Sequence, residues 1–151
     1  MKKVFVLGIS TLFLWSCNNT TEKSTEKQAT ENHAEHQHDE SSEAIELNNG
    51  EKWLVNEEMK PFVMKGEELV NSFIQNNHTD YKALAQQLKE QNDQLIKSCT
   101  MDGKAHDELH KWLHPHMQLI ESLGDAENMA QANTIIEQLK ESFNTYHTYF
   151  Q

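Results

Sequence analysis

Four consecutive stretches after residue 56 repeat apolar residues every three or four positions, which is the spacing of one face of an α-helix. They cover residues 57–76, 80–99, 102–123 and 125–150, and few residues separate one from the next. A helix of ~20 residues is roughly 30 Å long, and short connections make neighbouring helices run antiparallel. The pattern predicts an all-α protein, an up-down-up-down antiparallel four-helix bundle over residues 56–151.

Several residues mark where these helices are expected to begin and end. Asn56 and Asp102 are candidate N-caps of the first and third helices, and Gly124 is the expected stop of the third. Pro61 fits poorly in the interior of the first helix, so that helix starts either at about Glu57, after the Asn56 cap, or near Pro61, after a separate turn. Pro115 lacks the N–H that the helical ladder requires, so we expect it to bend the third helix.

The segment ahead of the bundle has two parts with different expectations. Residues 45–55, IELNNGEKWLV, place apolar positions on both sides of a turn-forming Asn-Asn-Gly triplet, which predicts a short hairpin or an extended clip. Residues 17–44 have no aromatic and no large aliphatic side chain. Because such a segment cannot bury enough apolar surface to offset its ordering, we expect a disordered, flexible tether.

Residues 1–16 are predicted to be a signal peptide. Two lysines precede an apolar run of about a dozen residues, which is too short to span a bilayer. The Leu-Trp-Ser-Cys step that ends at Cys17 resembles the bacterial lipoprotein processing signal, which implies lipidation of Cys17; the alternative is an ordinary secretory signal cut elsewhere. By the same resemblance, Asn18 favours the outer membrane. We therefore expect a cell-envelope protein anchored to a membrane through lipid.

The charge of the chain excludes some classes of partner. The formal net charge is −11, there is no arginine, and loss of the two leader lysines would take the charge to about −13. Nucleic-acid binding needs a basic patch, so no nucleic-acid partner is expected. A strongly acidic surface attracts cations instead.

Residues 99–117, CTMDGKAHDELHKWLHPHM, hold one thiol, two thioethers and four imidazoles. In an up-down bundle, the starts of helices one and three and the ends of helices two and four share one end. We predict a metal site at this end, formed by Cys99, Met101, His106, His110 and His147.

The direction of each ligand follows from the 100° step of a helix. Cys99 and His106 are expected to face inward, flanked by His110 and His147, while His114 points to solvent. His106 and His110 are four residues apart, the spacing that lets two imidazoles hold one ion. Because thiolate and thioether select Cu(I) and imidazole suits Cu, Zn and Ni, a copper ion is favoured, with zinc possible.

Besides the metal site, structural interpretations of these residues and functions without this metal site remain open. Cysteine and methionine also serve as core residues, and His116 is expected to be a core histidine bonded to Asn92. The alternative function is a metal-free helical lipoprotein that docks or supports an envelope protein partner. A third is a b-type haem bundle with Met59 and His147 as axial ligands.

Two further predictions concern the tether and catalysis. Short histidine-rich tracts can capture Cu(II), Zn(II) or Ni(II), so His33, His36 and His38 are secondary metal ligands, or else only part of a solvated polar tract. A di-metal carboxylate enzyme needs two Glu-x-x-His steps with two further carboxylates facing inward, which this chain lacks. We do not expect an enzyme.

The stretches IELNNGEKW, NEEMKP and SCTMDGKAHDELHKWLHPHM, followed by a Tyr/Phe-rich helical end, resemble a group of small four-helix lipoproteins of Bacteroidota. The resemblance covers about residues 45–150 and implies fold and location rather than an activity. A weaker resemblance links the chain to helical domains attached to copper-efflux adaptor proteins, which carry a Cys-Pro-Met step. Here the step is Cys99-Thr100-Met101, and the likeness implies copper.

Overall fold

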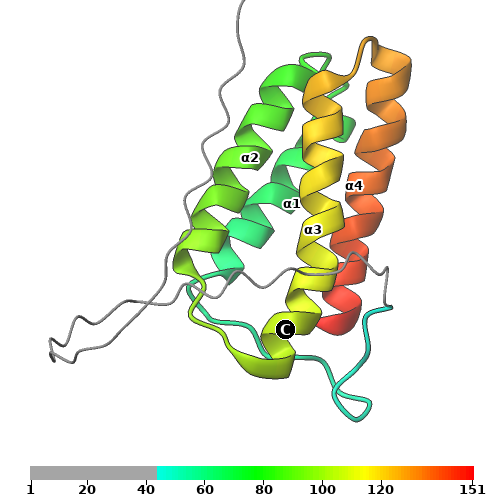
Figure 1. Cartoon of the computed structure of the whole chain (residues 1–151). Coiled ribbons are helices and arrows are strands. Elements are labelled where there is room, and N and C mark those ends of the chain that lie inside the picture. Colours follow the sequence, from blue (N-terminus) through cyan, green and yellow to red (C-terminus); the bar gives the residue numbers. More distant parts are fainter. Residues whose placement is uncertain (1–43) are drawn as a thin grey trace, which may run out of the picture. The chain divides into compact units, whose positions relative to one another are not determined.

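The computed structural model describes residues 44–151 of the chain. Four helices follow one another: α1 (Lys60–Gln75), α2 (Tyr81–Ser98), α3 (Gly103–Asp125) and α4 (Met129–Tyr149). The chain reverses direction at each connection, and α4 packs against α1 as well as α3 (Figure 1). The predicted all-α antiparallel four-helix bundle is confirmed. The expected signal peptide, Cys17 and residues 17–43 of the expected tether lie outside the described residues.

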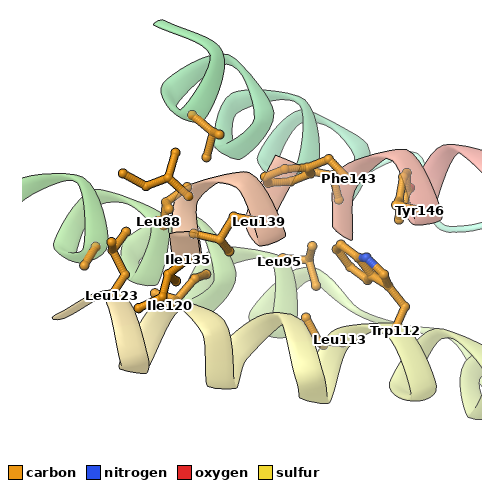
Figure 2. Packing of buried hydrophobic residues seen from close by; sticks show 14 of the residues in the cluster. Leu88, Leu95, Trp112, Leu113, Ile120, Leu123, Ile135, Leu139, Phe143 and Tyr146 are labelled. Carbon is orange, nitrogen blue, oxygen red and sulfur yellow. The ribbon is translucent and has the colours of Figure 1, made fainter. Parts of the chain in front are cut away.

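The apolar stripes of the four helices meet in one core. Figure 2 shows their side chains pointing into the space between the helices. Trp112 of α3 lies 4.9 Å from the ring of Tyr146 on α4, and its indole N–H donates to the Ser142 carbonyl at 2.8 Å. Buried positions on the predicted stripes include Val70, Phe73, Leu84, Leu88, Leu95, Leu109, Leu113, Ile120, Leu123, Ala132, Ile136, Leu139 and Phe143.

The start of α1 settles one open alternative. α1 begins at Lys60, so Pro61 falls in the first turn, where its missing N–H is not needed by the helix. Asn56 is not the cap that the sequence suggested. Its side-chain oxygen accepts a 2.9 Å hydrogen bond from the Thr100 N–H, so it ties the segment before α1 to the α2–α3 connection.

The end of α3 and the start of α4 differ from the predictions. α3 runs through Pro115 and Gly124 to Asp125, so Gly124 is not the stop. It keeps a negative φ, and nothing requires a left-handed residue there. α4 begins at Met129 rather than at 125, because the Asn128 side chain caps it by accepting a 3.0 Å hydrogen bond from the Gln131 N–H.

Residues 44–55 form an extended segment with one tight turn. Asn48 and Glu51 exchange backbone hydrogen bonds of 2.8 and 3.0 Å around Asn49 and Gly50, both of which have positive φ. The chain then runs beside the C-terminus. The Trp53 N–H donates to the Tyr149 carbonyl at 2.8 Å, and the Gln151 N–H donates to the Trp53 carbonyl at 2.9 Å. We call this segment the clip. Its hydrogen bonds join the chain ahead of α1 to the end of α4.

Candidate metal centre

Three histidines on successive turns of α3 lie side by side; we call His106, His110 and His114 the histidine row. The Nε2 atoms of His106 and His110 are 3.0 Å apart, and Nδ1 of His110 is 3.0 Å from Nε2 of His114. Neighbouring rings meet edge to face, with centroids 4.5 and 4.9 Å apart. His110 thus directs one ring nitrogen toward each of its two neighbours.

The row follows from helical geometry. Residues four apart lie on nearly the same face and drift about 40° per step. The row therefore runs from the flank of the bundle toward solvent: His106 and His110 are half-buried and His114 is exposed. The predicted pairing of His106 with His110 on one face is confirmed. His114 is exposed, as expected, and it also joins the other two rings, which the sequence analysis did not foresee.

The spacing of the nitrogens suits particular coordination geometries. Imidazole nitrogens bind first-row metals at about 2.0–2.1 Å, so an ion held by two nitrogens 3.0 Å apart would see them at about 95°. A regular tetrahedral ion would need them about 3.3–3.4 Å apart at the same bond lengths. An angle near 90° is that of neighbouring ligands in tetragonal sites, which are typical of Cu(II) and Ni(II).

The other predicted ligands lie at the expected end of the bundle but have other surroundings. The start of α3 and the end of α4 share that end (Figure 1). There, His147 of α4 is exposed and its Nε2 lies 2.8 Å from a carboxylate oxygen of Glu67 on α1. Cys99 and Met101 are half-buried and pack against the core. Within residues 44–151, no three or more His, Cys, Asp or Glu side chains gather around one point where they could hold an ion.

His116 is a core histidine, as predicted. It is 1 % exposed, stacks on Trp112 at 4.8 Å and meets the edge of Phe143 at 4.8 Å. Its Nδ1 lies 2.8 Å from the Ser142 hydroxyl, so the predicted bond to Asn92 is wrong. Burial lowers the pKa of His116 to about 4, so the ring is neutral at physiological pH.

Glu108 is a buried carboxylate that the sequence analysis missed. It is 2 % exposed, and its two oxygens accept 2.9 Å hydrogen bonds from the Glu46 N–H and the Lys111 ammonium. Burial works to raise its pKa. The bond from Glu46 and the bond and charge of Lys111, helped by the charge of Lys104, outweigh that effect and hold the pKa below its usual value. Glu108 lies one helical turn before Trp112, within the apolar stripe of the helix. This position was the sequence signal that could have indicated its burial.

Comparison with known proteins adds no function. No protein-family model, no curated protein and no solved structure matches the chain. None of the four helices in residues 44–151 is both long enough and apolar enough to cross a membrane.

Proposed function

We propose that this protein is a lipid-anchored envelope protein that binds a transition-metal ion, copper first, through His106 and His110, and buffers it or hands it on. The observation that carries the proposal is the 3.0 Å separation of the two Nε2 atoms on one face of α3. In the structure this contact is a hydrogen bond between the two rings. Rotation of the side chains alone, with no change in the backbone, would turn both ring nitrogens toward one ion, as histidines four residues apart on a helix allow.

The choice of metal rests on ligand type and angle. Divalent ions bind nitrogen sites with affinities that rise to Cu(II) and fall again at Zn(II). The angle of about 95° that the two nitrogens allow also favours a tetragonal ion over tetrahedral zinc. The net charge of −11 draws cations to the surface. Cys99 and Met101, just ahead of α3, are the further ligands that we propose for Cu(I).

Buffering or transfer suits a site of this kind better than a permanent structural metal. A structural zinc site is closed by four protein ligands. Two imidazoles leave positions for water or for ligands of a receiving protein, and the half-buried pair opens toward the exposed His114. His33, His36 and His38 would collect ions ahead of this site.

The test is a metal titration of the full-length protein, purified in detergent without an affinity tag and with His33, His36 and His38 replaced by glutamine. Cu(II) and Zn(II) are titrated under oxidising conditions and Cu(I) under reducing ones. The double variant His106→Ala, His110→Ala should lose affinity for Cu(II) by about a hundredfold, as expected when chelation is lost. Equal affinity for this variant and the parent would remove the site.

Two single variants separate the histidine row from the larger predicted cluster. His147→Ala should leave Cu(II) affinity unchanged, because His147 is engaged with Glu67. Cys99→Ser should weaken Cu(I) binding only. If both variants lowered Cu(II) affinity and the His106/His110 variant did not, the ion would sit among Cys99, Met101 and His147 instead.

The second candidate is a metal-free helical lipoprotein that docks an envelope partner. It is favoured by the lack, within residues 44–151, of a group of three or more His, Cys, Asp or Glu ligands. It predicts that a chelator changes neither the melting temperature nor the capture of the partner. No observation favours the haem bundle, since Met59 is buried in the core and His147 bonds to Glu67 on the surface.

A further inference from the structure

The histidine row holds two nitrogen pairs rather than one, and both use His110. Nε2 of His110 lies 3.0 Å from His106, and Nδ1 of His110 lies 3.0 Å from His114. Each pair has the same 3.0 Å spacing, at which one ion would see the two nitrogens at about 95°. We infer that the row offers a transition-metal ion two overlapping positions, one between His106 and His110 and the other between His110 and His114, and that one ion at a time occupies them. This inference rests on the proposed function.

The single proton of a neutral imidazole makes the two positions exclusive. When an ion binds Nε2 of His110, the ring keeps its proton on Nδ1; when an ion binds Nδ1, the proton is on Nε2. A second ion would have to remove that last proton as well, which is costly beside a charge already bound. The row therefore binds one equivalent.

The same proton gives a role to the outer histidine that does not bind the ion, which is His114 in the first position and His106 in the second. With the ion between His106 and His110, the Nδ1–H of His110 points at Nε2 of His114, 3.0 Å away, and can donate to it. With the ion between His110 and His114, the Nε2–H of His110 points at Nε2 of His106 in the same way. Such a bond to the second nitrogen of a ligating histidine fixes the ring and strengthens the ligand. The two outer histidines thus exchange the roles of ligand and hydrogen-bond acceptor.

Movement of the ion between the positions needs no change in the backbone. The ion leaves one outer histidine and one nitrogen of His110, and it binds the other nitrogen of His110 and the other outer histidine. The His110 proton moves to the nitrogen that the ion has left. Water can carry that proton, because the row lies at the surface with His114 exposed. The position beside His114 is the more exposed of the two, so we assign it to loading and release, and the half-buried position beside His106 to retention.

The test compares single variants in the background without tether histidines, described above. Cu(II) titration should give one equivalent for the parent. His106→Ala and His114→Ala should each lose affinity by about tenfold, the effect expected when an outer partner of a metal-bound histidine is removed. His110→Ala should lose about a hundredfold or more, as chelation disappears from both positions. His147→Ala is the matched control and should bind like the parent.

A second readout reports which nitrogen of His110 holds the ion. In ¹⁵N NMR spectra of the Zn(II)-loaded protein, His106→Ala should show His110 bound only through Nδ1, and His114→Ala only through Nε2. The parent should show both forms.

The outcomes separate this inference from the proposed function. If His114→Ala bound like the parent and the parent itself held the ion through Nε2 of His110 alone, there would be one position, and the proposed function would stand without the inference. Two equivalents in the row would also overturn it. No binding by the parent would remove the proposed function itself.

Discussion

Glu108 of α3 accepts a 2.9 Å hydrogen bond from the backbone N–H of Glu46, a residue of the clip 62 positions earlier in the chain. The Glu46 carbonyl in turn accepts a 2.6 Å bond from the indole N–H of Trp53, which pairs with the end of α4. The clip is therefore fastened to the helix that carries the histidine row and to the last turn of the bundle. Its anchor on α3 lies between His106 and His110 in sequence.

The first prediction concerns this anchor. Glu108→Ala removes the acceptor of the Glu46 N–H and the partner of the Lys111 ammonium at a buried position. We expect the free energy of unfolding to fall by about 1–3 kcal/mol, measured by urea denaturation. Glu121→Ala on the exposed face of the same helix is the control and should change it by no more than about 0.5 kcal/mol. Equal stabilities of the two variants would show that the anchor contributes nothing.

The second prediction concerns pH and His116. Its folded pKa is lowered to about 4 from an ordinary 6.5 by burial, so the unfolded chain takes up a proton at a higher pH than the folded one. The contribution of His116 to the free energy of unfolding is therefore fully present above about pH 6.5. It is lost as the pH drops toward 4, by about 3 kcal/mol in total. Urea denaturation from pH 7 to pH 4, with a chelator present, measures this slope.

His116→Leu provides the comparison for that slope. The leucine cannot be protonated, so the decline between pH 6.5 and pH 4 should largely disappear. Below about pH 4.5 both proteins should lose stability, since the pKa of Glu108 is held low in the folded state and its stabilising contribution is lost as the pH falls through that value. An unchanged slope in the leucine variant would mean that another group titrates in this window.

His116 also shows what the sequence pattern can and cannot predict. Periodicity fixed its direction, because 100° per residue places position 116 among Leu109, Trp112 and Ile120. It could not name the partner. Ser142 is a small, half-buried residue at the edge of the α4 stripe, and it carries no signal that separates it from any other surface serine.

Glu108 and the clip are a second case in which the sequence pattern does not identify the partner of a buried residue. A charged residue on an apolar stripe is normally read as exposed, since carboxylates are rarely buried unless paired. Here the pairing group is a backbone N–H of the clip, and a contact between segments 62 residues apart leaves no periodic trace. The histidine row is the opposite case. His106 and His110 were predictable as neighbours because their contact lies within one helix, whereas the surroundings of Cys99 and His147 depend on packing between helices.

The third prediction concerns Asn92, the partner that His116 does not use. Its side-chain nitrogen is buried and has no hydrogen-bond partner, which costs about 1–3 kcal/mol compared with a solvated amide. Asn92→Leu keeps a similar size and removes that cost. We expect the urea midpoint to rise, with an unchanged m-value and a gain on the order of 1 kcal/mol. A loss of stability instead would show that the amide has an acceptor in solution.

The fourth prediction compares two helical glycines. A Cβ added at Gly66 of α1 would lie 3.1 Å from Cζ of Phe143, whereas one added at Gly124 of α3 would meet nothing closer than Cβ of Ala85 at 3.8 Å. Alanine is the better helix former by about 1 kcal/mol at either position. Phe143 is 2 % exposed and is held by the ring of His116, so it has little room to move. Overpacking of this kind costs about 1–3 kcal/mol.

Gly124→Ala should therefore raise the melting temperature by a few degrees, and Gly66→Ala should lower it. The two variants add the same methyl group to a helix, so their difference isolates the close approach of α1 to Phe143. Gly66→Ala combined with Phe143→Leu should recover part of the loss, because the shorter side chain makes room for the new methyl group. If Gly66→Ala alone were as stabilising as Gly124→Ala, α1 and α4 would not be packed as closely as the 3.1 Å approach requires.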